Sequence, residues 1–232
     1  MTHPRIILIE TSTSLCSTAL LEGNEITARR ESSTPRAHAA MTAVFIQEML
    51  SERGLKSADC DAVCLSMGPG SYTGLRVGSS TAKGLCFGSG IPLIATGTLD
   101  ILCAQAIEEG LPEGCTHIVP MIDARRMEVY TAVYDSAGVP LSEVSPAVIS
   151  GPESVPSQAR GAGGILYIGD GVGKCEALLG GEGRWFRQEC PRADSMKNPA
   201  LKEFNAGNFR DIAYFEPFYL KDFVATVSKK LF

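Results

Sequence analysis

The chain has 232 residues, 44% of them hydrophobic and 20% charged, and it carries a formal net charge of −5. This is the composition of a globular protein, and the length allows one large core or two modest ones. The acidic balance argues against a protein that grips nucleic acid unaided, because that needs a basic face, but it allows work on RNA within a complex. The N-terminus has no apolar stretch of signal-peptide length, and no window is long enough to span a bilayer, so we expect a cytoplasmic protein without membrane contact.

Eight cysteines and three histidines set what metal or disulfide chemistry to expect. The cysteines lie mostly within apolar runs and form no Cys-x-x-Cys pair. In a chain of this length the pattern predicts reduced, buried thiols and no disulfide framework. The histidines, His3, His38 and His117, are widely scattered, so we predict no metal site.

The chain begins with a predicted meander of three strands. Residues 5–11 are apolar almost throughout, as is typical of a central strand, and Glu10 stands near the end of that run. Residues 18–22 and 25–31 read as two further strands joined by a hairpin turn. The first sheet therefore begins with antiparallel strands and has an acid at the end of its first strand.

A helix is predicted over residues 37–53, where good helix formers precede Gly54, a natural C-cap. Only Thr42, Gln47 and Glu48 are polar between residues 39 and 50. A helix that is apolar nearly all round is usually covered on more than one side. One side is its own sheet, and the other is covered by the rest of this chain or by a second protein.

A glycine-rich loop follows the next strand, residues 62–66, and opens into a helix over residues 73–87. Three glycines and a proline between Gly68 and Gly74 force a sharp turn, and the Thr73 hydroxyl is placed to cap the helix. Free amides at a positive helix end can hold an anion. The candidate anion or nucleotide contacts are Gly70, Ser71, Thr73 and Gly74. The alternative is a plain strand-to-helix turn, and the loop lacks the Gly-Lys-Ser/Thr of a Walker phosphate loop.

The helix over residues 73–87 carries glycines that cost helix stability, about 1 kcal/mol each against alanine. Such a helix usually needs a close backbone approach, and we infer that a neighbouring helix makes it, with packing on the parent sheet as the alternative. A strand over residues 92–95 and a helix over residues 98–109 complete an α/β layer with a mixed sheet.

The second half repeats the pattern of the first. Residues 118–124 form an apolar run that reaches Asp123, and residues 128–134 alternate as a returning strand, as the strands around Glu10 do. Residues 140–164 are rich in turn formers, and residues 180–208 give no clear pattern. We expect residues 216–221 to be extended and residues 223–232 to fray.

The residues offer little catalytic chemistry. Glu10 and Asp123 could hold a metal–phosphate group between two duplicated halves, but acids at strand ends are also common turn residues. A helical metal site at His38 would want a second histidine at i+4, where the chain has Thr42. No Gly-x-Ser-x-Gly elbow is present. We therefore predict no catalytic residue.

Three motifs occur in the order and spacing of one family. They are Ile9-Glu-Thr-Ser-Thr13, Gly68-Pro-Gly-Ser-Tyr-Thr-Gly-Leu-Arg-Val-Gly78, and Ile122-Asp-Ala-Arg-Arg126 with Glu128-Val-Tyr130. In these residues the chain resembles the TsaB (YeaZ) family of bacterial tRNA threonylcarbamoyladenosine biosynthesis proteins. The likeness is clear over residues 5–135 and weaker beyond. The chain departs from the family pattern with Glu10, where relatives more often have aspartate, and with Met127, where they often have glycine.

The resemblance implies an α/β, actin-like ATPase fold of two ribonuclease-H-like domains, each with a mixed sheet flanked by helices. The first domain, which carries the partner-binding helices, would span residues 1–110, and the second, degenerate one residues 111–215. Residues 216–232 would be a tail that packs back on the first domain.

The resemblance also implies a non-catalytic subunit. It would form a heterodimer with the catalytic, metal-binding TsaD and recruit the ATPase TsaE, so that threonylcarbamoyl is transferred to the adenosine beside the anticodon of tRNAs that read ANN codons. Contact with tRNA would be only indirect. No cofactor would bind to this chain alone, and ATP would sit at the junction of the complex. The alternative is an independent ATP-binding or metallopeptidase-like (glycoprotease family) enzyme of the same fold.

In the family the first two helices form the dimer interface, which makes homodimers when the partner is absent. Carried over to this chain, the resemblance implies an interface of His38, Met41, Phe45, Leu75, Gly78, Ala82 and Leu85.

Overall fold

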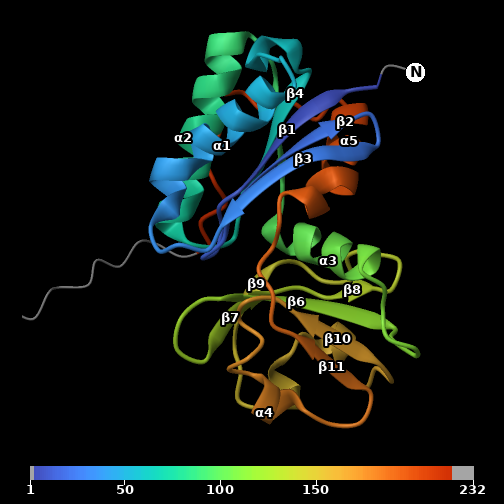
Figure 1. Ribbon diagram of the computed structural model, residues 1–232. Helices are drawn as coiled ribbons and strands as arrows, with labels where there is room; N and C mark the ends of the chain where they lie inside the picture. Colours follow the sequence, from blue (N-terminus) through green and yellow to red (C-terminus); the bar gives the residue numbers. More distant parts are fainter. Residues whose placement is uncertain (1–2, 221–232) are drawn as a thin grey trace, which may run out of the picture.

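The computed structural model describes residues 3–220, and these form two α/β units placed one above the other (Figure 1). The first unit is built on a five-stranded sheet in the order β3-β2-β1-β4-β5. Its strands are β1 (Arg5–Glu10), β2 (Cys16–Glu22), β3 (Glu25–Ser32), β4 (Ala62–Ser66) and β5 (Leu93–Thr96). β1, β2 and β3 pair antiparallel, whereas β4 and β5 run parallel to β1, so the predicted meander and mixed sheet are confirmed.

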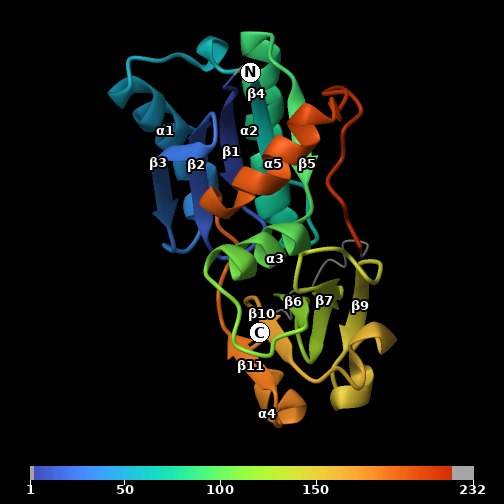
Figure 2. The ribbon, with the colours of Figure 1, turned by 90° about the vertical axis from the view of Figure 1, so that its right-hand side faces the viewer.

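Helices cover both faces of this sheet. α1 (Ala37–Glu52) and α2 (Tyr72–Ser89) lie on one face, where Ile46 and Met49 of α1 and Ala82 of α2 join the strands in one buried cluster. On the opposite face, Ala200 of α5 (Lys197–Asn205) packs with Ile6 and Leu8 (Figure 2). Because strand residues alternate between faces, a strand that is apolar at every position supplies both cores.

The second unit repeats the arrangement of the first. Its sheet has the order β11-β10-β6-β7-β9, with β8 paired to β6. The strands are β6 (His117–Asp123), β7 (Glu128–Thr131), β8 (Tyr134–Asp135), β9 (Ser145–Val148), β10 (Ile165–Ile168) and β11 (Arg184–Arg187). The strand predicted over residues 128–134 is thus two strands, β7 and β8. With β8 set aside, each sheet is an antiparallel meander extended by two parallel strands. The duplicated, two-domain fold expected from the resemblance is confirmed.

The helix between the two sheets serves both units. α3 (Thr98–Glu108) contributes Ile101 to the cluster of the first unit, while Leu99 and Leu102 pack with residues of β6 and β10. The remaining helical turns are short: η1 (Ser57–Asp59), η2 (Pro152–Ser154), η3 (Ser157–Ala159), α4 (Glu176–Leu179) and η4 (Asp194–Met196).

The chain returns to the first unit earlier than expected. Met196 and Ala200 pack in the core cluster of the first sheet, and the amide of Arg210 donates to the carbonyl of Leu93 on β5 at 2.8 Å. The boundary expected at residue 215 therefore falls too late, because residues from about 193 onward complete the first unit. The Phe218 amide then donates to Met67 at 2.7 Å. Lys221 and the fraying expected of residues 223–232 lie outside the described residues.

Two glycines of α2, Gly74 and Gly84, have different surroundings, so their alanine variants form a matched pair. A Cβ on Gly74 would lie 2.0 Å from the Thr11 carbonyl oxygen, whereas a Cβ on Gly84 would meet nothing within 4 Å. We predict that Gly74→Ala lowers the free energy of unfolding by about 2 kcal/mol or more, because backbone must move. Gly84→Ala should raise it by about 0.5–1 kcal/mol through helix propensity. Urea unfolding followed by circular dichroism checks both, and equal effects of the two substitutions would contradict the interpretation.

Candidate functional site

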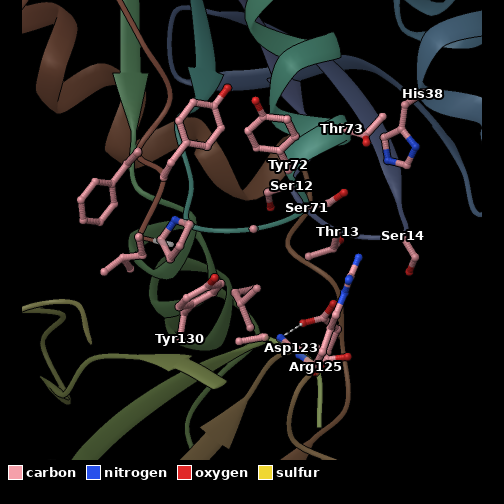
Figure 3. Close-up of a pocket in the computed structure, with 18 of the residues that line it drawn as sticks. Ser12, Thr13, Ser14, His38, Ser71, Tyr72, Thr73, Asp123, Arg125 and Tyr130 are labelled. Atoms are coloured by element: carbon pink, nitrogen blue, oxygen red, sulfur yellow. Dashed lines mark hydrogen bonds between the residues drawn. The ribbon is translucent and has the colours of Figure 1, made fainter. Parts of the chain in front are cut away.

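A cleft of about 690 Å³ lies between the two units, at the ends of β1, β4 and β6 (Figure 3). This volume is within the range of ligand sites in proteins. The first unit lines it with the turn after β1, the start of α1 and the glycine loop, and the second unit with the β6–β7 hairpin and Asp170. The residues that line the cleft include Ser12, Thr13, Arg36, His38, Gly70, Ser71, Tyr72, Thr73, Asp123, Arg125, Tyr130, Asp170 and Tyr219.

The glycine loop is pressed against the turn that follows β1. The Ser71 amide donates to the Ser12 carbonyl at 2.6 Å, and the Thr11 hydroxyl donates to the Gly74 carbonyl at 2.9 Å. A Cβ on Gly70 would lie 2.4 Å from the Ser12 carbonyl oxygen. The glycines at positions 70 and 74 are thus required by a close approach of backbone to backbone.

The cap of α2 is Ser71, one position before the helix, and not Thr73 as the sequence suggested. The Ser71 hydroxyl accepts a hydrogen bond from the Gly74 amide at 3.3 Å. Thr73 instead lies in the first turn of the helix and lines the cleft, as His38 does (Figure 3). The predicted anion contacts Gly70, Ser71 and Thr73 all line the cleft, whereas Gly74 is buried beneath it.

Two hydroxyls of the β1–β2 turn are buried without a partner. Ser12 Oγ and Thr13 Oγ1 have no hydrogen-bond partner within the described part of the chain, and both residues line the cleft. A buried polar group without a partner costs free energy unless a ligand or water satisfies it. These hydroxyls, together with the positive end of α2, can donate hydrogen bonds to oxygen atoms of a bound molecule.

Glu10 lies beneath the cleft and does not line it. Its side chain is fully buried, Oε1 accepts the Ser12 amide at 2.5 Å, and Oε2 has no partner among residues 3–220. Burial raises the pKa of the Glu10 carboxyl to about 7. The side chain therefore has no direct access to a ligand in the cleft.

The acid of the second unit that was expected to pair with Glu10 across the two halves, Asp123, has other partners. Asp123 forms an ion pair with Lys174, and its Oδ1 accepts the Arg125 amide at 2.8 Å. Asp170, which sequence reasoning missed, accepts the Asp123 amide at 2.9 Å, and burial raises the pKa of its carboxyl. Within residues 3–220 no three histidine, cysteine or acidic side chains are grouped so that they could hold a metal ion.

Three arginines have left-handed backbone, and two of them line the cleft. The φ angles are 64° at Arg36, 69° at Arg125 and 51° at Arg126. This conformation costs an L-residue other than glycine roughly 1–2 kcal/mol. Strain of this kind collects at functional positions, because glycine or asparagine would be cheaper. Nothing in the local sequence pattern signalled these three residues.

Aromatic side chains form the remaining wall. The rings of Tyr72 and Tyr219 are 4.9 Å apart, and the Arg76 guanidinium lies 4.8 Å from the centre of the Tyr72 ring. Tyr219 comes from the returning chain, so the first unit supplies both rings from segments far apart in sequence.

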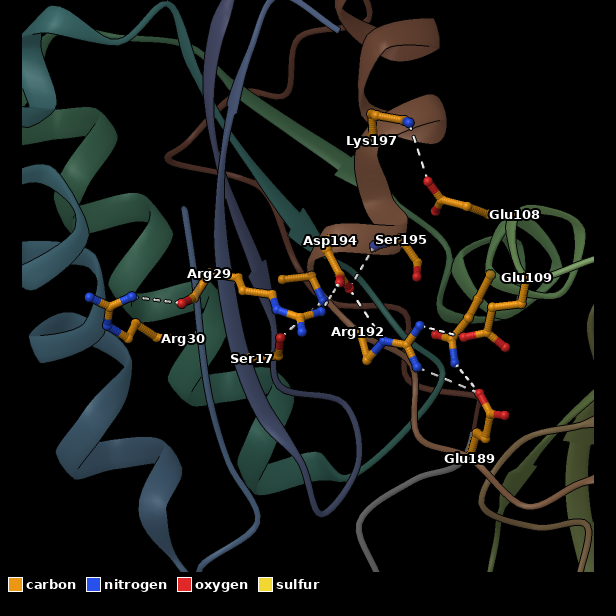
Figure 4. A network of polar contacts seen from close by, with 12 residues as sticks. Ser17, Arg29, Arg30, Glu108, Glu109, Glu189, Arg192, Asp194, Ser195 and Lys197 are labelled. Carbon is orange, nitrogen blue, oxygen red and sulfur yellow. Dashed lines mark hydrogen bonds and ion pairs between the residues drawn. The ribbon is translucent and has the colours of Figure 1, made fainter. Parts of the chain in front are cut away.

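A network of ion pairs ties together the two segments that cross between the units (Figure 4). Arg192 contacts Glu109, Glu189 and Asp194, and Arg187 also contacts Glu109. Glu109 follows α3 at the first crossing, and Arg192 precedes η4 at the second. A single ion pair on the surface contributes little to the stability of a protein. A network of partly buried groups that share partners, however, restricts how the two walls of the cleft move relative to each other.

Four of the seven residues expected at the partner interface are instead in the core of this chain. Phe45 is 7% exposed, Leu75 1% and Ala82 0%, and Gly78 is also buried. The expectation was wrong for these four, because Leu75, Gly78 and Ala82 lie on the buried face of α2 and Phe45 lies on the buried face of α1. A Cβ on Gly78 would lie 2.3 Å from Thr11 Oγ1, so its close approach is to the β1–β2 turn and not to a helix.

His38, Met41 and Leu85 remain partly exposed, and a different set of residues forms the outer face of the two helices. Phe87 is 83% exposed and Val44 40%. Ala40, Ala43, Gly84 and Gly88 are exposed as well. We call these six residues the outer helix face. Its residues are small apart from one large exposed ring, and the polar residues Gln47, Glu48, Arg76 and Ser80 are also exposed on the same two helices.

Comparisons with known proteins agree with this geometry. The family model described as "TsaD: tRNA N6-adenosine threonylcarbamoyltransferase" matches residues 26–157. The tRNA threonylcarbamoyladenosine biosynthesis protein TsaB of Escherichia coli is 32% identical over 230 residues, which cover 95% of this chain and 96% of that protein. YeaZ from Pseudomonas aeruginosa has a TM-score of 0.79 and 27% identity, covering 94% of this chain and all of that one.

A more distant structure shares the fold alone. The inorganic polyphosphate/ATP-glucomannokinase from Arthrobacter sp. strain KM has a TM-score of 0.50 and 11% identity, over 86% of this chain and 99% of that one. The class is therefore a two-domain protein of the actin-like ATPase fold. Within that class, the chain belongs to the TsaB family, a part of the wider family that the matching model describes.

The buried Glu10 carboxyl predicts how stability depends on pH. The pKa of Glu10 is about 7 in the folded chain against about 4.5 when exposed. The free energy of unfolding is therefore not reduced by this carboxyl below about pH 4.5, and it falls as the pH rises from 4.5 to 7. We expect this loss to reach about 3 kcal/mol in the wild type and to be absent in Glu10→Gln. Urea unfolding at pH values from 5 to 8 measures it.

Glu25→Gln, at an exposed position at the start of β3, is the control and should follow the wild type. Parallel pH profiles for the wild type and Glu10→Gln would contradict the assignment of the loss to this carboxyl.

Proposed function

We propose that this protein is a non-catalytic scaffold of the cytoplasmic machinery that makes threonylcarbamoyladenosine in tRNA. In this role it forms a heterodimer with TsaD, which carries out the transfer, and helps to recruit TsaE. The proposal is supported by membership of the TsaB family, whose Escherichia coli relative is named for this biosynthesis. None of the described helices is long and apolar enough to cross a membrane.

The observation that carries the proposal is the outer helix face. Phe87 is 83% exposed near the end of α2, with the exposed Gly84 and Gly88 next to it on the helix, and such a ring is costly to leave in water. Small residues let a second pair of helices approach closely, and the large ring can then fill a pocket in the partner. The same face would join two copies of this chain when TsaD is absent.

The proposal of a non-catalytic role is supported by the side chains near the cleft that could act as metal ligands. Thr42 stands one helical turn after His38, where a metal site on this helix would want a second histidine, and the Thr42 hydroxyl donates to the His38 carbonyl at 2.6 Å. Glu10 is closed off beneath the cleft. In this proposal any nucleotide that acts with the protein sits at the junction with TsaD.

The interface is tested by Phe87→Asp, which puts a charge on the outer helix face. We predict that this variant keeps its fold, because the side chain is in solvent, and that co-purification with TsaD falls by at least tenfold. Val148→Asp is the matched control, since Val148 is 64% exposed on β9 of the second unit, and it should bind TsaD as the wild type does.

Undiminished pull-down of TsaD by Phe87→Asp would refute the interface. Substantial ATP turnover by the isolated chain would refute the non-catalytic role and favour an independent enzyme of the same fold.

A further inference from the structure

Four arginines lie at the cleft or next to residues that line it, in a protein whose net charge is −5. Arg36 and Arg125 line the cleft from opposite units, Arg126 follows Arg125 in the chain, and Arg76 lies over the ring of Tyr72, which itself lines the cleft. We call these four residues the arginine rim. In Figure 3 the Arg125 side chain rises from the second unit toward Thr13 and Ser14 of the first.

The charges of the arginine rim are not neutralised by neighbours. Within residues 3–220 none of the four makes an ion pair; of the other arginines, those at positions 5, 29, 30, 53, 187 and 192 are paired and those at positions 160, 184 and 210 are not. The two acids of the cleft are turned to other partners. Asp123 is paired with Lys174, and Asp170 accepts the Asp123 amide, while burial of Asp170 disfavours its charged form. The rim is thus free to meet an anion.

The backbone holds the rim in place. Arg36, Arg125 and Arg126 are the three described residues other than glycine with left-handed backbone, so strain is retained at these three positions of the rim. Arg76 is oriented by its contact with the ring of Tyr72, which in turn packs on Tyr219. Guanidinium groups match phosphate in a bidentate way and are the preferred side chains for phosphate recognition.

From this geometry we infer that the arginine rim binds the phosphodiester backbone of tRNA directly. The inference rests on the proposed function, which brings tRNA to the complex, and it replaces the expectation of indirect contact only. Arginines contributed by both units, none with an ion pair within residues 3–220, fit a chain of phosphates better than one small anion. The rim does not read sequence, so this chain would position the substrate while TsaD acts on it.

The test measures binding of a fluorescently labelled 17-nucleotide anticodon stem-loop RNA to the heterodimer with TsaD, by anisotropy at several salt concentrations. The variant is Arg125→Asn with Arg126→Asn, because asparagine tolerates left-handed backbone and the fold is kept. Lys56→Asn is the control, since Lys56 is exposed at the end of the first unit where β4 begins, away from the cleft.

We expect the double variant to raise the Kd at least tenfold and to reduce the dependence of log K on log salt by about 1 to 2, as loss of one or two phosphate contacts requires. The control should stay within twofold of the wild type. Wild-type Kd and salt slope in the double variant, or no RNA binding by the wild-type heterodimer, would overturn the inference.

Two further outcomes separate this inference from the proposed function. Failure of the wild-type chain to co-purify with TsaD would refute the proposed function. A heterodimer that forms normally but ignores the arginine substitutions refutes the rim alone.

Discussion

The contact between the β1–β2 turn and the start of α2 is the constraint on which the rest of the molecule depends. The carbonyls of Thr11 and Ser12 lie against Gly74 and Gly70, where any side chain would collide. This contact fixes where α2 begins, how close it lies to the sheet, and which of its faces points away from the core. The cleft floor and the outer helix face are both consequences of it, because one lies at the start of α2 and the other along its exposed side.

Much of the architecture could be predicted from the sequence because it follows from local patterns. Continuous apolar runs marked the buried strands, and the acid-ended strand followed by a returning strand marked the second unit as a copy of the first. The helix predicted over residues 37–53 is α1 (Ala37–Glu52) within one residue. The register of long, strongly patterned elements is determined by burial, which hydropathy reflects directly.

The details of the site could not be predicted in the same way, because they depend on contacts between distant segments. Leu75 and Ala82 share a helix face, but the sequence does not say whether that face meets the sheet or a partner. Ser71 and Thr73 are both good cap residues, and the choice between them follows from where Ser12 presses on the loop. Left-handed backbone at arginine has no signature, since the usual indicator is glycine or asparagine. The returning α5 was missed for a similar reason, because its short amphipathic stretch follows a run of irregular structure.

The path of the chain has a consequence for how the protein is made. The first unit is complete only when α5 and residues 206–220 have packed on its sheet, and these are synthesised after the whole of the second unit. At about 5–20 residues per second, the apolar face of β1 and β4 that α5 covers stays open for several seconds while residues 97–196 are added. The second unit must therefore fold beside an unfinished neighbour. The aromatic wall of the cleft is completed last, so a partner that binds in this cleft can assemble with the protein only after Tyr219 has been translated.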